Sequence, residues 1–123
     1  MPDKSNKKLS LAIQARVRIV RGDDIAIGPG KAELLAFIRE TGSIAEAARR
    51  MGMSYMRAWM LIKTMNRCFK KPLIRAARGG KEGGGAALTE TGKTALALYQ
   101  QMGADSLRAA QSRWQKIKVL LRE

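Results

Sequence analysis

The feature that most constrains the fold is a pair of short helix signals separated by one glycine. Ser43 and Glu46 form an S-x-x-E pattern, which typically caps a helix by satisfying two free backbone N–H groups. The segment that follows is rich in alanine, and Gly52 interrupts it just after Met51. The sequence therefore predicts a short helix over residues 43–51 that ends in a tight turn.

A longer helix signal begins directly after this turn. Ser54 can cap its start, and the helix is predicted to run to about Lys70, because Pro72 forbids its continuation. Small residues are needed where two helices cross closely, and Ala47 and Ala48 supply them on the first helix. One face of the second helix is apolar and is predicted to be buried: Ala58, Leu61, Ile62, Met65 and Phe69. Two helices joined by so short a turn have the geometry of a helix-turn-helix motif.

The opposite face of the second helix carries the side chains that would reach DNA in such a motif. Residues at the start of this helix meet base edges in the major groove, and cations contact phosphates. The candidate DNA-binding residues of the motif are Ser43, Ser54, Tyr55, Met56, Arg57, Trp59, Lys63 and Arg67. Met60 shares this face, and methionines among cations are unusual on a solvated surface. The alternative interpretation is an ordinary corner between two helices of a bundle.

A glycine-rich hairpin is predicted after this motif. Leu73–Ala77 and Ala86–Leu88 are expected to form two short strands, and the eight residues between them include five glycines. Arg78 and Lys81 make the tip cationic, and Arg75 lies close to it. All three are candidate contacts for phosphates or for the minor groove. A helix-turn-helix followed by a basic hairpin is a winged helix, so this pattern weakens the bundle interpretation.

The N-terminal part of the chain predicts a β-hairpin and then a helix. From Leu9 to Ile19 the odd-numbered residues are apolar and the even-numbered ones mostly polar, which indicates a strand with one buried face. Arg21–Asp24 is expected to form a turn, and Ile25–Ile27 a short return strand. Apolar residues at spacings of three and four then predict a helix over residues 31–41, which ends at Gly42.

The last part of the chain predicts a long helical region, capped at its start by Thr89. Apolar residues recur along it at spacings of three and four over about seven turns, which keeps them on one stripe. A winged helix needs only the first turns of such a stripe for its own core, so we expect the remainder to bind a second copy of the chain. The candidate dimerisation residues are Leu96, Tyr99, Leu107, Ala110, Trp114, Ile117 and Leu121.

The charge of the chain indicates its kind of partner. A net charge of +14 favours a polyanion, either nucleic acid or an anionic membrane surface. Residues 51–88, with eight basic and one acidic residue, carry half of this charge. Histidine is absent, which removes the commonest general base and metal ligand, and Cys68 alone can form neither an internal disulfide nor a cysteine-based zinc site. No apolar run is long enough to span a membrane.

Several short segments between about residues 11 and 100 form a more specific pattern. They are Thr41-Gly42-Ser43-Ile44, Ala47-Ala48, Gly52-Met53-Ser54-Tyr55, Arg57-Ala58-Trp59, Met65-Asn66, Gly79-Gly80-Lys81, Gly83-Gly84-Gly85-Ala86, Leu88-Thr89 and Gly92. This pattern resembles the N-terminal domain of molybdate-responsive ModE-type regulators. The resemblance implies a LysR-like winged helix, DNA binding, transcriptional control and a homodimer. Full-length members carry C-terminal oxyanion-binding domains, for which a chain ending at Glu123 leaves no room, so we expect no cofactor and no specific molybdate binding.

The sequence supports an enzyme less well than it supports a DNA-binding protein. Ala87–Thr94 fits a loosened phosphate-loop pattern, but Ala replaces the first glycine that the strict motif requires. A capped helix start is the favoured interpretation, and a nucleotide-handling enzyme that uses Gly92-Lys93-Thr94 is an alternative. Asp23 and Asp24 lie in a predicted turn, where Asp is common. Cys68 has no histidine to activate it as a nucleophile.

These patterns together predict a mostly α (α+β) protein with three parts. Residues 1–10 form a flexible basic arm, residues 11–92 a winged helix-turn-helix domain, and residues 93–123 a C-terminal helical dimerisation region. We expect a cytoplasmic, dimeric, sequence-specific regulator of transcription that binds double-stranded DNA, is not an enzyme and does not bind membranes. Its recognition helix, residues 54–70, would enter the major groove, and its wing, residues 73–88, would contact the backbone or the minor groove. The main alternative is a protein that binds nucleic acid without sequence preference.

Overall fold

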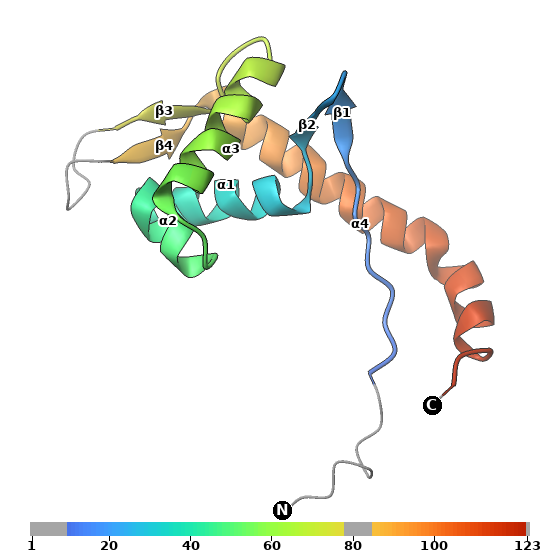
Figure 1. Ribbon diagram of the computed structural model, residues 1–123. Coiled ribbons are helices and arrows are strands. Elements are labelled where there is room, and N and C mark those ends of the chain that lie inside the picture. The colour runs from blue at the N-terminus through green and yellow to red at the C-terminus, as the bar shows by residue number, and fades with distance from the viewer. Residues whose placement is uncertain (1–9, 78–84, 123) are drawn as a thin grey trace, which may run out of the picture.

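The computed structural model describes residues 10–77 and 85–122. Its elements, in chain order, are β1 (Ile19–Arg21), β2 (Asp24–Ile27), α1 (Pro29–Thr41), α2 (Ile44–Arg50), α3 (Tyr55–Cys68), β3 (Ile74–Ala76), β4 (Ala86–Leu88) and α4 (Glu90–Lys118). Two antiparallel hairpins, β1–β2 and β3–β4, lie on either side of α3, and α4 runs on past the three shorter helices (Figure 1). The predicted fold class, a mostly α (α+β) winged helix-turn-helix, is confirmed.

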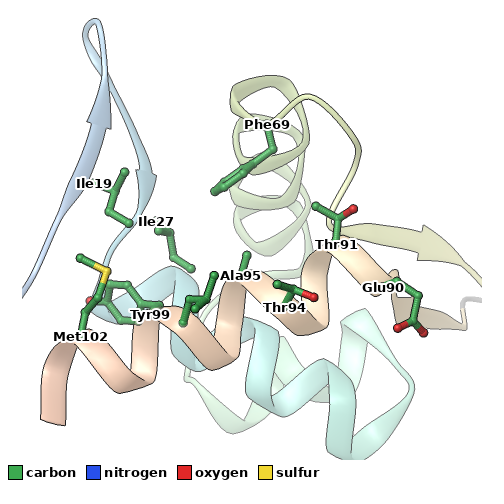
Figure 2. Close-up of a pocket in the computed structure, with 10 residues that line it drawn as sticks. Ile19, Ile27, Phe69, Glu90, Thr91, Thr94, Ala95, Tyr99 and Met102 are labelled. Carbon is green, nitrogen blue, oxygen red and sulfur yellow. The ribbon is translucent and has the colours of Figure 1, made fainter. Parts of the chain in front are cut away.

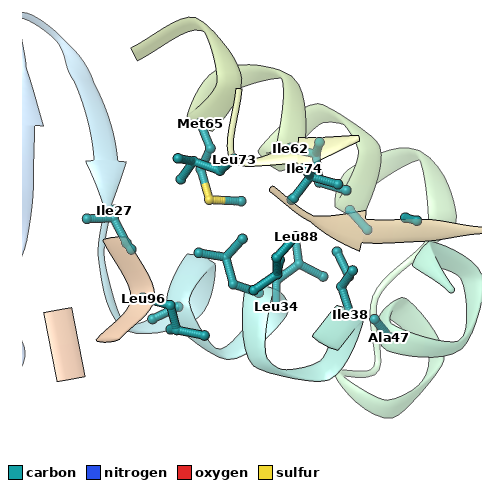
Figure 3. Packing of buried hydrophobic residues seen from close by; sticks show 14 of the residues in the cluster. Ile27, Leu34, Ile38, Ala47, Ile62, Met65, Leu73, Ile74, Leu88 and Leu96 are labelled. Carbon is teal, nitrogen blue, oxygen red and sulfur yellow. The ribbon is translucent and has the colours of Figure 1, made fainter. Parts of the chain in front are cut away.

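The hydrophobic core is centred on α1, with α3, β4 and the first turns of α4 around it (Figure 3). Leu34 and Ile38 of α1, Met65 of α3 and Leu96 of α4 are completely buried. Full burial of such a side chain is worth about 1.5–3 kcal/mol, so these few residues fix the helices against one another. The alanines predicted at the helix crossing, residues 47 and 48, are 0% and 2% exposed. Their small size lets α2 pack closely on its neighbours.

Local signals set most of the helix boundaries. The Ser54 hydroxyl accepts a hydrogen bond from the Arg57 N–H (3.1 Å) at the start of α3, as predicted. Gly52 has φ = +67°, which L side chains rarely adopt, and this makes the sharp turn between α2 and α3. Helix α1 begins at Pro29, two residues earlier than predicted, because proline at the first helical position loses no backbone hydrogen bond.

The predicted capping box of α2 forms only in part. The Ser43 hydroxyl accepts a hydrogen bond from the Glu46 N–H (3.1 Å), but the Ser43 N–H donates to the Thr41 hydroxyl (3.2 Å). The Glu46 carboxylate pairs with Arg49 and Arg50 instead, and the hydrogen bond from Arg49 lowers the pKa of Glu46. The reciprocal bond of the box is lost because both of its groups have nearer partners.

The predicted strand from Leu9 to Ile19 is wrong for most of its length. Only Ile19–Arg21 pairs with β2, and residues 10–18 form no regular structure. The alternation still marks burial, since residues 11, 13, 15 and 17 are half-buried and their neighbours are exposed. The Tyr99 hydroxyl donates to the Val17 carbonyl (2.6 Å), which places the end of this segment nearest β1 against α4 (Figure 1). Burial raises the pKa of Tyr99. β2 is only four residues long, so it pairs with no more of this segment.

The wing is anchored at its base. Strands β3 and β4 pair antiparallel, with Ile74 opposite Leu88. The Ala86 N–H donates to the Gly42 carbonyl (3.0 Å), which ties β4 to the turn between α1 and α2. The predicted tip cations, Arg78 and Lys81, lie outside the described residues, as do residues 1–9 of the predicted arm.

Candidate nucleic-acid interface

Helix α3 presents one full face to solvent. Ala58, Ile62 and Met65 point into the core, and Leu61 and Phe69 pack against it partly buried, as the periodicity predicted. On the other side, the side chains of Met56 and Met60 are 65% and 53% exposed. Tyr55 and Trp59 are exposed beside them, at 49% and 39%. A wide part of α3 is therefore free to contact a partner.

The cations on this face are held in different ways. The Lys63 ammonium lies 4.6 Å from the centroid of the Trp59 ring, a cation–π contact. The Arg67 guanidinium donates to the Asp24 carboxylate of β2 (3.1 Å), and both side chains are well exposed. Such an ion pair is worth at most about 1 kcal/mol, so it orients Arg67 without removing it from solvent. Arg57, near the start of α3, forms no ion pair with any described residue.

Charge on this part of the chain has one sign. Residues 51–77 contain six basic residues and no acidic residue. Arg57 and Lys63 on α3 and Arg75 on β3 are all exposed. The structure therefore presents exposed cations on both the second helix of the motif and the first strand of the wing.

Two predicted DNA contacts have a structural role in this fold. The hydroxyls of Ser43 and Ser54 cap α2 and α3. The Ser43 backbone also pairs with Gly85 in a single antiparallel β-bridge. Ser54 is exposed, whereas Ser43 is half-buried. Both residues position the ends of the two helices.

Asn66 joins α3 to the wing, a role that sequence reasoning missed. Its carbonyl oxygen accepts hydrogen bonds from the N–H groups of Leu73 (2.8 Å) and Ile74 (3.3 Å). Its amide donates back to the Ile74 carbonyl (3.3 Å). The sequence did offer one signal for this role. Asn is a poor helix former that often bonds nearby backbone groups, and Asn66 lies within two turns of Pro72, where the helix cannot continue.

We expect Asn66→Ala to destabilise the chain by about 1–3 kcal/mol. Leu73 and Ile74 are buried, so their N–H groups would lose their partner without gaining water. Thr64→Ala is the matched control on the same helix, because the Thr64 hydroxyl bonds only the Met60 carbonyl of α3 itself. Urea unfolding measures both variants. Equal and small decreases in stability for the two would contradict the anchoring role.

The Gly-Lys-Thr segment at residues 92–94 lies in the first turn of α4. The Gly92 N–H donates to the capping hydroxyl of Thr89 (2.9 Å), and Lys93 pairs with Glu90 (3.3 Å). A Cβ atom on Gly92 would lie 2.1 Å from the Leu73 carbonyl oxygen. The glycine is thus required by close packing, which supports the helix-start interpretation over a phosphate loop. Within residues 10–77 and 85–122, no group of three or more His, Cys, Asp or Glu residues could hold a metal ion. In the same residues, no helix is long and apolar enough to cross a membrane.

The predicted dimerisation residues fall into three groups along α4 and the short segment after it; α4 is a single helix of 29 residues, and Leu121 lies beyond its end. Leu96 belongs to the core of this chain and is completely buried. Ile117 and Leu121 are exposed, at 53% and 43%. The half-buried residues between these ends are Tyr99, Leu107, Ala110 and Trp114.

An apolar pocket lies between the β1–β2 hairpin, the end of α3 and the first half of α4 (Figure 2). Its volume is about 500 Å³. The apolar lining residues are Ile19, Ile27, Phe69, Ala95, Leu98, Tyr99 and Met102. Sequence reasoning missed this pocket, because its walls come from three separate segments.

A capped helix pair with a tight turn, an exposed second helix and a following hairpin define a winged helix-turn-helix DNA-binding domain. The chain belongs to the bacterial regulatory helix-turn-helix proteins of the lysR family, whose model matches residues 31–93. This membership confirms the fold and family implied by the sequence pattern.

The relatives with known names share the same region. The chain is 42% identical over 85 residues to the molybdenum-pterin-binding protein MopB of Rhodobacter capsulatus, covering 69% of this chain and 32% of that protein. It is 42% identical over 71 residues to the DNA-binding transcriptional dual regulator ModE of Escherichia coli (strain K12), covering 58% and 27%. It is 41% identical over 86 residues to the transcriptional regulator ModE of Yersinia pestis, covering 65% and 33%. The chain thus spans about a third of the length of these relatives, and the predicted ModE-like N-terminal region is confirmed.

Proposed function

We propose that the chain is a sequence-specific transcriptional regulator that binds double-stranded DNA as a cytoplasmic homodimer and has no enzymatic activity. The observation that carries this proposal is the exposed face of α3, where aromatic and thioether side chains lie among exposed cations. Cations alone would serve any polyanion, whereas a face that also offers Tyr55 and Trp59 can distinguish base edges by shape and contact. The ModE names of several relatives support the same role.

In the proposed complex, α3 enters the major groove and the wing lies along the backbone. Tyr55 and Arg57 are near the N-terminus of α3, the end that meets bases in helix-turn-helix proteins. Arg75 on β3 is exposed and is suited to a phosphate, and we propose the same role for Arg78 and Lys81 from the sequence alone. Asn66 keeps the helix and the wing in one fixed relation, so both can engage the same duplex.

A homodimer is supported by the apolar surface that α4 and its C-terminal extension leave exposed. Leu98, Ile117, Val119 and Leu120 are each more than half exposed. Apolar surface of this kind marks contact sites, and a two-fold pair is the default arrangement of regulators that read two half-sites.

Selection of bound duplexes from a random pool tests this function. We expect enrichment of one sequence that contains two half-sites, with centres about 10 base pairs or a multiple of that apart. Tight binding without any enrichment would show that the chain binds nucleic acid without sequence preference. Failure to retain duplex at low salt would contradict nucleic-acid binding altogether.

We expect Arg57→Ala and Arg75→Ala to affect DNA binding in different ways. If Arg57 contacts a base, its removal should cost about 1–3 kcal/mol on the selected duplex and much less on a shuffled one. If Arg75 contacts a phosphate, its removal should weaken binding to both duplexes alike and flatten the salt dependence by about one unit of slope. Titrations of both variants at several salt concentrations measure this. If Arg75→Ala lowers the preference for the selected duplex and Arg57→Ala weakens binding to both duplexes alike, the wing reads the sequence and the helix positions the protein.

A further inference from the structure

We propose that Met56 and Met60 read thymine methyl groups in the major groove; this inference rests on the proposed DNA-binding function. The two methionines are 65% and 53% exposed, and they lie on consecutive turns of α3. Met56, Met60, Lys63 and Arg67 follow one another at spacings of four, three and four, which keeps them on one face. This face is opposite the buried line of Ala58, Ile62 and Met65.

The methionines have no role in the packing of the described chain. Met65 is completely buried and Met51 and Met53 pack against the core, whereas Met56 and Met60 contribute to no part of it. An exposed thioether side chain leaves water only when a partner covers it. We therefore expect the apolar surface of this face to be buried by a bound partner.

DNA is the occupant that the surrounding charge selects. Residues 51–77 carry six basic residues and no acidic residue, so a polyanion is favoured over a protein surface. In the major groove, the one apolar group on the base edges is the 5-methyl of thymine. Methionine is unbranched and polarisable, so it can follow the shape of such a methyl group without requiring a hydrogen-bond partner.

The helix geometry also restricts where these thymines lie. Side chains four residues apart on a helix have Cβ atoms about 5–6 Å apart. Neighbouring bases on one strand are about 3.4 Å apart along the duplex. Met56 and Met60 thus match two thymine methyls that are one or two base-pair steps apart, and each half-site should contain such a pair.

Replacement of thymine by deoxyuridine tests this directly, because it removes the methyl group and keeps the base pair. A series of selected duplexes, each with one dT changed to dU, covers every thymine of a half-site. We expect affinity to fall about three- to tenfold where the changed thymine contacts a methionine. Met56→Ala and Met60→Ala should bind the thymine duplex more weakly and lose their sensitivity to the change at one position each. Met102→Ala is the matched control, because Met102 is 41% exposed on α4 and is not part of the exposed face of α3, and it should keep the wild-type ratio.

Each other outcome has a distinct meaning. Sequence-selective binding with every dT-to-dU change within twofold would overturn the methyl readout and leave the proposed function intact. The same sensitivity in the methionine variants as in wild type would assign the methyls to other residues and also overturn it. Absence of any preferred duplex would instead contradict the proposed function. Thermal unfolding of the variants should match wild type, since both side chains are exposed.

Discussion

Gly92→Ala is expected to destabilise the chain by about 3 kcal/mol or more. The added Cβ would lie 2.1 Å from the Leu73 carbonyl oxygen and 3.0 Å from its carbonyl carbon. These are backbone atoms, and Leu73 is completely buried and held by Asn66, so the clash can be relieved only by moving α4 or β3. Overpacking of a core usually costs about 1–3 kcal/mol, and a backbone clash of this kind lies at the upper end.

Gly103→Ala is the matched control for this prediction. Gly103 lies on the same helix, and nothing comes within 4 Å of the position of its Cβ. Alanine there should stabilise the chain by about 0.5–1 kcal/mol, because it favours the helix over the unfolded state. Urea unfolding of both variants gives the comparison. A Gly92→Ala protein as stable as wild type would contradict the close packing of α4 on the wing.

The double variant Ile117→Glu and Leu121→Glu is expected to be monomeric and to bind the two-half-site duplex at least about 100-fold more weakly. Both side chains are exposed in the single chain, so the substitutions remove nothing from the core of the winged helix, and any fall in the unfolding temperature should come from the lost association. Two linked half-sites typically add about 10²–10⁴ in affinity, and a monomer loses this gain. Binding to a single half-site should change little.

The control for this variant is Ser112→Glu with Gln115→Glu. It adds the same two negative charges to the same end of α4, at exposed positions that face away from the stripe of Leu107, Ala110, Trp114 and Ile117. We expect it to remain dimeric and to lose only a small factor in affinity. Light scattering and DNA titration measure both variants. A dimeric mass for the first variant would show that the copies associate through another surface.

Much of the fold could be predicted because its signals are local. Ser54 and Thr89 cap their helices through hydrogen bonds within three residues, and Gly52 makes the turn between α2 and α3. Pro72 follows the end of α3, which was predicted within two residues. The 3.6-residue period separated the buried and exposed faces of α3 correctly. The DNA roles of its exposed residues stay predictions.

The features that sequence reasoning missed depend on long-range contacts. The period-two pattern before Ile19 indicated a strand, but a strand also needs a partner, and residues 10–18 have none; Val17 instead bonds Tyr99 of α4. Asp24 and Arg67 meet across 43 positions, and no local pattern pairs them. The sequence did not predict the packing roles of Asn66 and Gly92, because both roles depend on Leu73 from another segment.

The hairpin β1–β2 shows how such contacts support the candidate interface. β2 contacts α3, and Asp24 holds the Arg67 guanidinium at the end of that helix. Lys31 of α1 donates to the Ile25 carbonyl, and partial burial lowers the pKa of this lysine. The hairpin is therefore fixed to both α1 and α3, although two strands alone are barely stable in water.

Sequence-selective DNA binding is tested most directly by the ratio of two affinities of the wild-type chain. One is for the duplex recovered by selection, and the other is for a shuffled duplex of the same composition, both at physiological salt. We expect a ratio of about 10³ or more, which persists as salt rises while both affinities fall. A ratio near one at every salt concentration would contradict the regulator and leave only charge-driven binding.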